Sequence, residues 1–172
     1  MDAYPDVLAA VEQLGYDSKK VNVIIHQFVT LTEDGEPVKM STRKANYITL
    51  DELIDEVGQD VVRYFFIMRG INTHLNFDMA LAKDESDENP VFYLQYAHAR
   101  LCNILKHAEG QGHDLKKNTD LSPLSLDSEI QLVKFLLECP NVIEKAKDNL
   151  EPQTIATYLQ SLAGMFHKYY AK

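Results

Sequence analysis

Three basic side chains, Lys39, Arg43 and Lys44, lie in one short segment, with the hydroxyl residues Ser41 and Thr42 between them. A cationic loop of this kind can close over a polyphosphate, because ammonium and guanidinium groups pair with the charge that builds on the phosphates as one of them is displaced. Hydroxyl and backbone N–H groups donate further hydrogen bonds to the same oxygens. The residues alone leave open a second interpretation, an ordinary solvated basic turn.

Local sequence signals indicate the elements that would hold this segment. The polar stretch 33–37 predicts a tight turn before it. After it, Thr49 and Glu52 have the spacing of a capping box, and Gly58 marks the end of the helix that they open. The basic segment is therefore expected to be a loop between a turn and a well-capped helix.

A second helix is expected directly afterwards, over residues 61–69, with Asp60 as its N-cap and Gly70 at its end. Asp60 and Arg63 are charged residues within this largely apolar element. Because buried charge is tolerated only when it is paired and hydrogen-bonded, we expect both side chains to lie in the packed junction and hold the helix pair in place, rather than to act in catalysis.

The residues upstream predict one helix and one strand. Residues 5–14 are typical of a short helix that Gly15 ends. The β-branched run 21–31 predicts a strand buried on both faces of a parallel sheet. This chain barely supplies neighbours for such a strand, so its backbone and apolar side chains would favour self-association.

Residues 71–78 mix strand and turn signals and are expected to form a connector.

The second half of the chain is almost wholly helical in its pattern. Asn89 and Pro90 predict the cap and first turn of a long helix that Gly110 and Gly112 end. A surface loop is expected over residues 110–127. Three further helices are expected over residues 128–138, 140–150 and 152–170. Pro140 and Pro152 stand in the first turn of the second and third of these helices.

Composition limits the function classes. The chain has 172 residues and a formal net charge of −9, which argues against loose, charge-driven coating of DNA or RNA but not against an RNA held by one local patch. No apolar run approaches the roughly 20 residues of a membrane helix, and no signal peptide is visible, so we expect a cytoplasmic protein without a membrane partner. Neither the two cysteines nor the scattered histidines have metal-ligand spacing, so no metal site is expected.

The basic segment reads Lys-Met-Ser-Thr-Arg over residues 39–43, which resembles the KMSKS signature of class I aminoacyl-tRNA synthetases. Its surroundings are more specific and resemble bacterial arginyl-tRNA synthetases from residue 8 to about residue 107, with a compatible helical pattern beyond. The segments that carry this resemblance are QFV (27–29), DGEPVKMSTR (34–43), ITLDEL (48–53), VG (57–58), Asp60, RYFF (63–66), LNFD (75–78) and NPVFYLQYAHAR (89–100).

The resemblance implies an enzyme that activates arginine with ATP, with Mg²⁺ expected, and transfers it to tRNA(Arg). It implies Lys39 and Arg43 as the catalytic residues, acting on the ATP phosphates. Two departures from the family pattern matter: Thr42 stands where the second lysine of KMSKS would be, and Ala45 replaces a glycine that is often found after the loop. The implied ATP-binding residues are Val38, Lys39, Met40, Ser41 and Thr42.

The same resemblance implies the fold class. We expect a mainly α chain, in which the remnant of a parallel α/β (Rossmann-like) catalytic domain edge over residues 1–87 is followed by an anticodon-binding α-helical bundle over residues 88–172. The HIGH motif of class I enzymes is absent, so the chain resembles a C-terminal fragment. A phosphate loop without the substrate pockets gives neither proximity nor orientation, so the isolated chain is expected to be catalytically inactive.

The long helix from Asn89 is the candidate RNA platform. Aromatic rings beside an arginine can stack on unpaired bases, and lysines can reach phosphates. Alternatively, the tyrosines pack a core, and Tyr96 and Arg100 form an ordinary intrahelical pair. Tyr158, Tyr169 and Tyr170 on the last helix are weaker candidates. The residues predicted to bind tRNA are Tyr93, Tyr96, Arg100 and Lys106.

Two other functions compete with the ligase fragment. One is a noncatalytic helical module that binds RNA or another protein. The other is a different class I synthetase, of the cysteinyl or methionyl type, which the 89–100 block disfavours because it matches the arginyl family.

Overall fold

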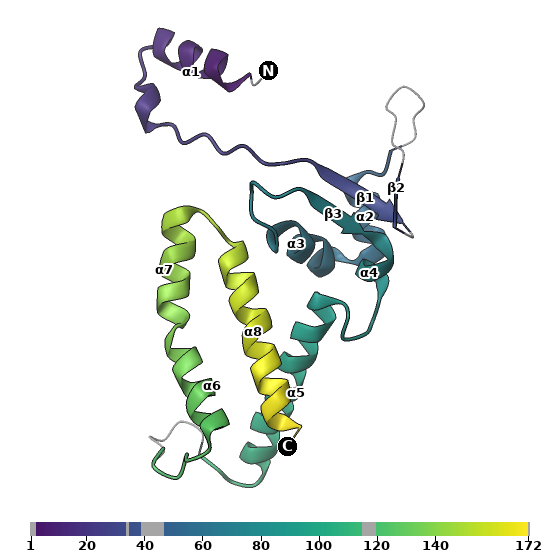
Figure 1. Ribbon diagram of the computed structural model, residues 1–172, viewed down its shortest axis with the longest axis vertical. Coiled ribbons are helices and arrows are strands. Elements are labelled where there is room, and N and C mark those ends of the chain that lie inside the picture. The colour runs from purple at the N-terminus through teal and green to yellow at the C-terminus, as the bar shows by residue number, and fades with distance from the viewer. Residues whose placement is uncertain (1–2, 34, 39–46, 115–119, 172) are drawn as a thin grey trace.

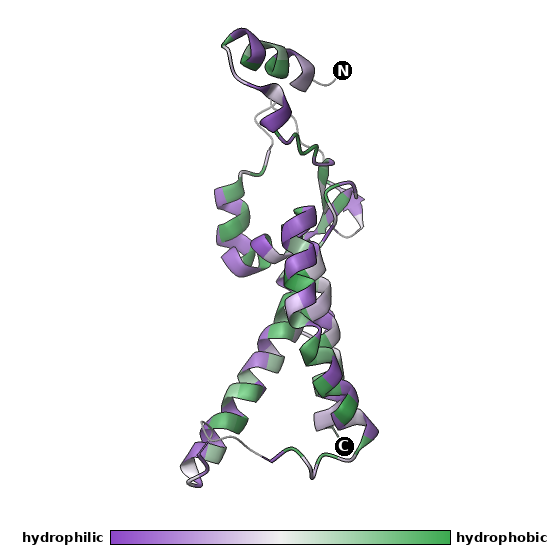
Figure 2. Ribbon diagram, turned by 90° about the vertical axis from the view of Figure 1, so that its left-hand side faces the viewer, coloured by the Kyte–Doolittle hydropathy of each residue, from purple (hydrophilic) through white to green (hydrophobic). Residues whose placement is uncertain are grey.

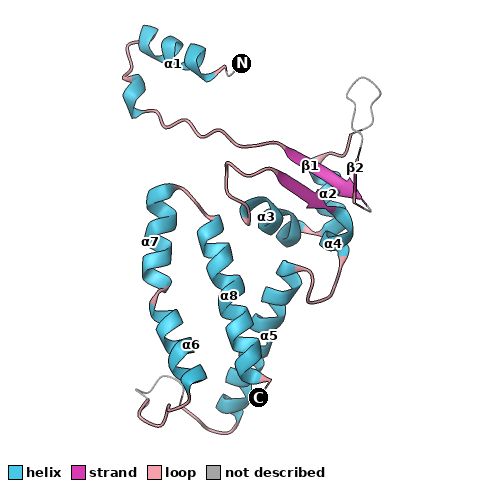
Figure 3. Cartoon of the chain, in the orientation of Figure 1, coloured by secondary structure: helices cyan, strands magenta, loops and turns pink. Residues whose placement is uncertain are grey.

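The computed structural model describes residues 3–33, 35–38, 47–114 and 120–171, which form a small α/β unit followed by a helical bundle (Figures 1 and 3). This agrees with the predicted fold class. The elements in chain order are α1 (Tyr4–Gln13), the 3-10 helix η1 (Ser18–Lys20), β1 (Val29–Glu33), β2 (Glu36–Pro37), α2 (Leu50–Val57), α3 (Gln59–Ile67), β3 (Leu75–Asp78), α4 (Met79–Lys83), α5 (Pro90–Gly110), α6 (Asp127–Leu137), α7 (Cys139–Asn149) and α8 (Gln153–Tyr170).

The N-terminal segment lies apart from the remaining elements (Figure 1). Helix α1 has a proline in its first turn and is followed by Gly15 at φ +84°, as its sequence predicts, yet none of its residues is buried. The prediction of a strand over 21–31 is wrong for its first eight residues, which are exposed and belong to no strand. The reason is that strand pairing begins only at Val29, opposite Leu75. The self-association predicted for this segment stays a prediction.

The sheet has the strand order β2-β1-β3. Strand β1 pairs antiparallel with β2, and it pairs parallel with β3 in a register that places Leu31 opposite Phe77. The expected parallel pairing therefore exists, but its partner comes from residues 71–78, which were predicted to be a connector. The helices α2 and α3 and the basic segment lie in sequence between these strands.

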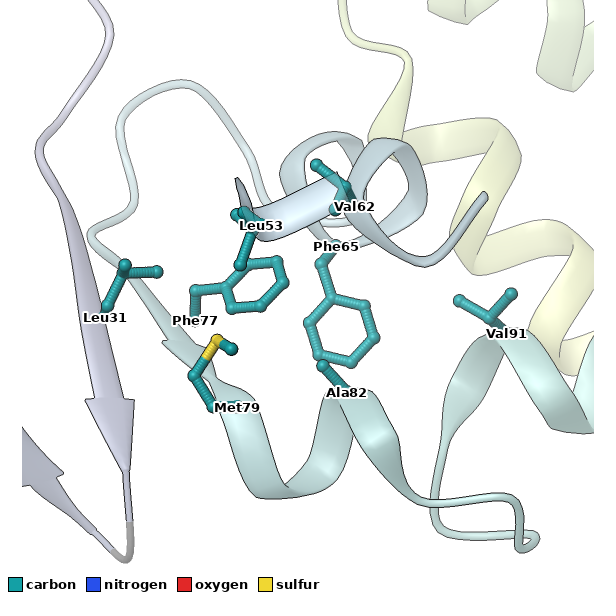
Figure 4. Close-up of a cluster of buried hydrophobic side chains, with 8 residues drawn as sticks. All are labelled: Leu31, Leu53, Val62, Phe65, Phe77, Met79, Ala82 and Val91. Atoms are coloured by element: carbon teal, nitrogen blue, oxygen red, sulfur yellow. The ribbon is translucent and has the colours of Figure 1, made fainter. Parts of the chain in front are cut away.

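A hydrophobic core joins the sheet to the helices around it (Figure 4). The rings of Phe65 from α3 and Phe77 from β3 lie at its centre, with centroids 5.1 Å apart. Phe77 is completely buried. The core consists of Leu31, Leu53, Val62, Phe65, Phe77, Met79, Ala82 and Val91.

Helices α2 and α3 both form as predicted, but α3 begins and ends about two residues earlier than expected. Gly58 adopts φ +86° and both ends α2 and precedes α3, so Asp60 lies in the first turn of α3 instead of capping it. Helix α3 also ends at Ile67, before Gly70. Asp60 and Arg63 are exposed, so the prediction that they are buried is wrong: the apolar side of α3 faces the core, and these two residues lie on its other side.

Asn89 begins α5 as predicted. Its Oδ1 accepts a hydrogen bond from the backbone N–H of Val91 (3.0 Å), and its Nδ2 donates to the carbonyl oxygens of Ala82 (3.2 Å) and Asp84 (2.8 Å). The side chain is 3% exposed and fully engaged, as a buried amide must be. It fixes the direction in which the bundle leaves the α/β unit.

Helix α8 is the central element of the bundle and contacts α5, α6 and α7. These four helices have apolar and polar residues on different sides (Figure 2). Ala97 and Ala163 are buried between α5 and α8 with Phe166. The three predicted C-terminal helices are confirmed to within one residue at each end. No helix in the described ranges is long and apolar enough to cross a membrane.

Gln160 of α8 connects the bundle to the α/β unit. Its Nε2 donates to the hydroxyl of Tyr64 on α3 (3.0 Å) and to the carbonyl oxygen of Pro90 at the start of α5 (2.6 Å). The Tyr64 hydroxyl donates to the carbonyl oxygen of Ala156 (3.4 Å). Burial raises the pKa of Tyr64. A small set of polar contacts thus ties α3, α5 and α8 together.

The core makes a direct stability prediction. Replacing Phe77, whose side chain is completely buried, by alanine (Phe77→Ala) removes packed apolar volume and is expected to lower the free energy of unfolding by about 3–5 kcal/mol. The matched control is Phe28→Ala, since Phe28 is 83% exposed. Chemical denaturation followed by circular dichroism measures both. Equal losses in the two variants contradict this core.

Candidate functional site

The basic segment lies outside the described residues, so the roles predicted for Lys39, Met40, Ser41, Thr42 and Arg43 stay predictions. The structure does describe the residues on either side of it. Val38, half-buried against the hydrophobic core, donates its backbone N–H to the carbonyl oxygen of Leu31 (2.8 Å). The segment therefore leaves the α/β unit from a residue that is hydrogen-bonded to β1.

The chain re-enters the fold at the capping box of α2. The Glu52 carboxylate accepts hydrogen bonds from the backbone N–H (2.7 Å) and hydroxyl (2.9 Å) of Thr49, and the Thr49 hydroxyl oxygen accepts the backbone N–H of Glu52 (3.2 Å). The backbone hydrogen bond from Thr49, followed by that from its side chain, lowers the pKa of Glu52. Both ends of the basic segment are thus fixed.

A second group of functional side chains lies between α5 and the end of α8. The Arg100 guanidinium lies over two tyrosine rings, 4.6 Å from the centroid of Tyr96 and 4.5 Å from that of Tyr170, and it donates a hydrogen bond to the Tyr96 hydroxyl. His167 stacks on Tyr96, with centroids 5.2 Å apart. We call Tyr96, Arg100, His167 and Tyr170 the aromatic cluster. It holds one cation in a defined position.

The predicted tRNA-binding residues have different surroundings. Tyr96 and Arg100 lie in the aromatic cluster and form the intrahelical pair that was one of the two alternatives, while their contact with RNA stays a prediction. Tyr93 is half-buried against the α5–α8 core, with its ring 4.6 Å from that of His167. Lys106 is exposed and does not line the hollow described next.

A hollow of about 580 Å³ adjoins the aromatic cluster. Most of the residues that line it were not predicted from the sequence. Their spacing on α5 was a partial signal, because many of them recur every three or four positions and therefore share one face of the helix. The hollow is lined by Tyr96, Ala99, Arg100, Asn103, Ile104, His107, Ala108, Gln111, His113 and Tyr170.

The other tyrosines of α8 have structural partners. The Tyr158 hydroxyl donates to the carbonyl oxygen of Phe135 (3.1 Å), and the two rings stack. The Tyr169 hydroxyl donates to the Glu129 carboxylate (3.2 Å), which raises the pKa of Tyr169. Tyr170, by contrast, is half exposed at the hollow. The described part of the chain holds no cluster of three or more metal-ligating side chains.

Comparison with known proteins shows which proteins this chain is similar to. The profile described as the DALR anticodon binding domain matches residues 94–172, which include the aromatic cluster and the hollow. An arginine–tRNA ligase of Salinibacter ruber is 53% identical over 98% of this chain, and one of Chlorobium limicola is 53% identical over 99%. The chain is homologous to a segment of the arginyl-tRNA synthetases. The resemblance predicted from the sequence is thereby confirmed.

Solved structures agree with this assignment. A Campylobacter jejuni protein provisionally assigned as an arginyl-tRNA synthetase superposes with a TM-score of 0.82 at 36% identity, over 98% of this chain and 36% of that one. Thermus thermophilus arginyl-tRNA synthetase shares the fold, with a TM-score of 0.67 at 21% identity, over 96% of this chain and 30% of that one.

The chain spans about 30% of the length of the two arginine–tRNA ligases that it matches. The domain boundary at residues 87 and 88 stays a prediction, since the profile match starts at residue 94, inside α5.

The capping box beside the basic segment predicts a pH dependence. The pKa of Glu52 is lower in the folded chain than its ordinary value of 4.5. The cap therefore contributes stability above the ordinary pKa, and this contribution is lost as the pH falls through the lowered one. Between pH 6 and pH 3, the wild type is expected to lose stability as the Glu52 carboxylate is protonated. The Glu52→Gln variant lacks this contribution and is expected to lose less. Thermal unfolding at both pH values measures the two losses. Glu85→Gln is the control, and identical pH dependence in wild type and Glu52→Gln refutes the assignment.

Proposed function

We propose that this chain is the part of a cytoplasmic arginine–tRNA ligase that grips tRNA(Arg) with helices α5 and α8 and carries the loop that acts on ATP. In this proposal the whole enzyme activates arginine with ATP and Mg²⁺ and transfers it to the tRNA. The observation that carries the proposal is the Arg100 guanidinium, held beside Tyr96 and Tyr170 at the edge of a hollow within the region matched by the anticodon-binding profile.

The physical argument begins with charge. The chain carries a net charge of −9, so nonspecific attraction cannot hold a polyanion, and an RNA must meet a local cation in a favourable geometry. Arg100 is such a cation, since its contacts with two rings reduce the conformational freedom that would be lost on binding. Exposed tyrosine faces and guanidinium planes are also the groups that stack on unpaired bases. A single-stranded RNA loop therefore fits this surface.

The basic segment supplies the second part of the proposal. Lys39 and Arg43 pair with the ATP phosphates, Ser41 and Thr42 donate hydrogen bonds to them, and the backbone near Val38 and Met40 lies by the adenine. Support comes from the residues that flank the segment, because Val38 is hydrogen-bonded to β1 and Thr49 caps α2. Flanking residues that are held in place reduce the entropy that a loop between them loses when it closes.

Titration of labelled tRNA tests the first part. The chain is expected to prefer tRNA(Arg) over a tRNA for another amino acid, with affinity that falls as salt rises. The Arg100→Gln variant removes a stacked cation, so its affinity is expected to fall about tenfold, with a shallower salt dependence. Lys145→Gln, on the exposed surface of α7, makes the same charge change elsewhere and is expected to alter affinity less than about twofold.

The same titration distinguishes the proposed function from that of a noncatalytic helical module. Equal binding of both tRNAs, or no binding in a chain whose circular dichroism is that of a folded protein, supports a noncatalytic helical module with another partner. Equal effects of Arg100→Gln and Lys145→Gln would mean that net charge, and not the aromatic cluster, determines binding.

The loop is tested in a protein of the relatives' full length. Lys39→Ala is expected to reduce arginine-dependent ATP–pyrophosphate exchange by about a hundredfold, because it removes a cation from the reacting phosphates, while tRNA affinity stays unchanged. Lys20→Ala is the matched control outside the loop. The 172-residue chain alone is expected to show no exchange, and robust exchange by it contradicts the proposal.

A further inference from the structure

The hollow beside Arg100 has an unusual lining for an acidic chain. The sequence contains 26 aspartates and glutamates, yet none of the described residues that line the hollow is acidic. Its polar lining instead includes the Arg100 guanidinium, the imidazoles of His107 and His113, and the amides of Asn103 and Gln111. These groups can all donate hydrogen bonds to an anion, and the two imidazoles can also acquire positive charge.

The contact between His107 and Gln111 shows how an anion would be received. The His107 Nε2 lies 2.9 Å from the Gln111 Nε2. With the amide nitrogen as donor, the His107 Nε2 accepts this hydrogen bond in the neutral ring. When His107 takes up a proton at Nε2, both nitrogens are donors in this orientation of the amide, and the contact is no longer a hydrogen bond. An anion placed between them accepts both N–H groups and restores the hydrogen bonding.

We propose that the hollow is a proton-linked phosphate site, which takes a backbone phosphate of the bound RNA as His107 and His113 become protonated. This inference rests on the proposed function and adds the chemical group that the hollow receives. The volume of about 580 Å³ accommodates a phosphate together with part of its nucleotide. Arg100 and the protonated imidazoles supply the positive charge.

The charged and titratable groups around the hollow favour this linkage. Helix α5 contributes Tyr96, Arg100 and His107, the turn after it contributes His113, and α8 contributes Tyr170.

Three charged residues and one further imidazole lie close to the hollow but are not among its described lining residues. Glu109 and Asp114 lie near it in sequence, and Lys168 lies in the last turn of α8, but none of the three is a lining residue. His167 is already engaged with Tyr93 and Tyr96. A phosphate placed in the hollow favours the charged form of His107 and His113, so protons and RNA bind cooperatively.

The sign of the effect follows from ordinary imidazole chemistry. Because the bound phosphate favours protonated imidazoles, the complex holds more protons than the free chain, and RNA affinity rises as the pH falls. Between pH 8 and pH 6, at constant ionic strength, we expect the affinity for tRNA(Arg) to rise by about five- to thirtyfold.

The test measures the binding of a tRNA(Arg) transcript to the 172-residue chain by calorimetry at pH 7, in two buffers of different ionisation enthalpy. The difference between the buffers gives the number of protons taken up, expected to be about one to two for the wild type. The double variant His107→Gln plus His113→Gln keeps polar side chains and is expected to take up fewer than about 0.3 protons, with affinity nearly independent of pH. His98→Gln, an exposed histidine of α5 that does not line the hollow, is the control and is expected to behave as wild type.

Each result decides the inference. No proton uptake by the wild type overturns it, and this measurement requires no variant to fold. Uptake that persists in the double variant also overturns it, because the protons then enter the RNA or another group. In both cases tRNA still binds and the proposed function stands. If the folded chain binds no tRNA at any pH, the proposed function fails and the phosphate site fails with it.

Discussion

The packing of α8 against α5 is the contact on which the rest of this structure depends. Small residues, Ala97 and Ala163, are buried between these helices with Phe166. Small side chains at such positions let two helices approach closely, which brings their flanking residues within reach of one another. At one end of the contact, Gln160 reaches Tyr64 and the carbonyl oxygen of Pro90. Towards the other end, Arg100 meets Tyr170. The same helix pair therefore attaches the bundle and forms the candidate site.

This arrangement separates two kinds of chemistry along the chain. The α/β unit fixes both ends of the cationic segment, through β1 on one side and the α2 cap on the other. The hollow is lined by residues between Tyr96 and His113, along α5 and just after it. The C-terminal end of α5 lies away from the α/β unit (Figure 1). Between them, Val91 of α5 is buried in the core of the α/β unit, and polar contacts add to it: Gln160 bonds to Tyr64, and Gln95 of α5 donates to Asp60 of α3 (3.3 Å). Such polar contacts set direction through hydrogen-bond geometry.

Local signals predicted much of the fold, because they act over a few residues. The Thr49 cap, the positive φ of Gly58 and the Asn89 cap each depend on close neighbours in the sequence, and each is present. Nonlocal features were harder to predict. The apolar run 21–28 has strand-forming residues but finds no strand partner within the described ranges, and periodicity cannot reveal that. Asp60 and Arg63 are expected in the interior because α3 is apolar on most of its surface, whereas both residues lie on its exposed side.

In the candidate site, too, local features could be predicted from the sequence and nonlocal ones could not. Tyr96 and Arg100 were found from their spacing on one helix. Tyr170 is a weaker candidate, and His167 is only one of the scattered histidines, because both reach the site from a helix about 70 residues further along the chain. No sequence pattern states which face of α8 meets α5.

The most direct test of the account is a ribonuclease footprint of tRNA(Arg) bound to the chain. The account predicts protection concentrated in the anticodon stem and loop, with the acceptor stem as accessible as in free tRNA. Protection of the acceptor stem alone, or a cleavage pattern unchanged at saturating protein, would contradict it.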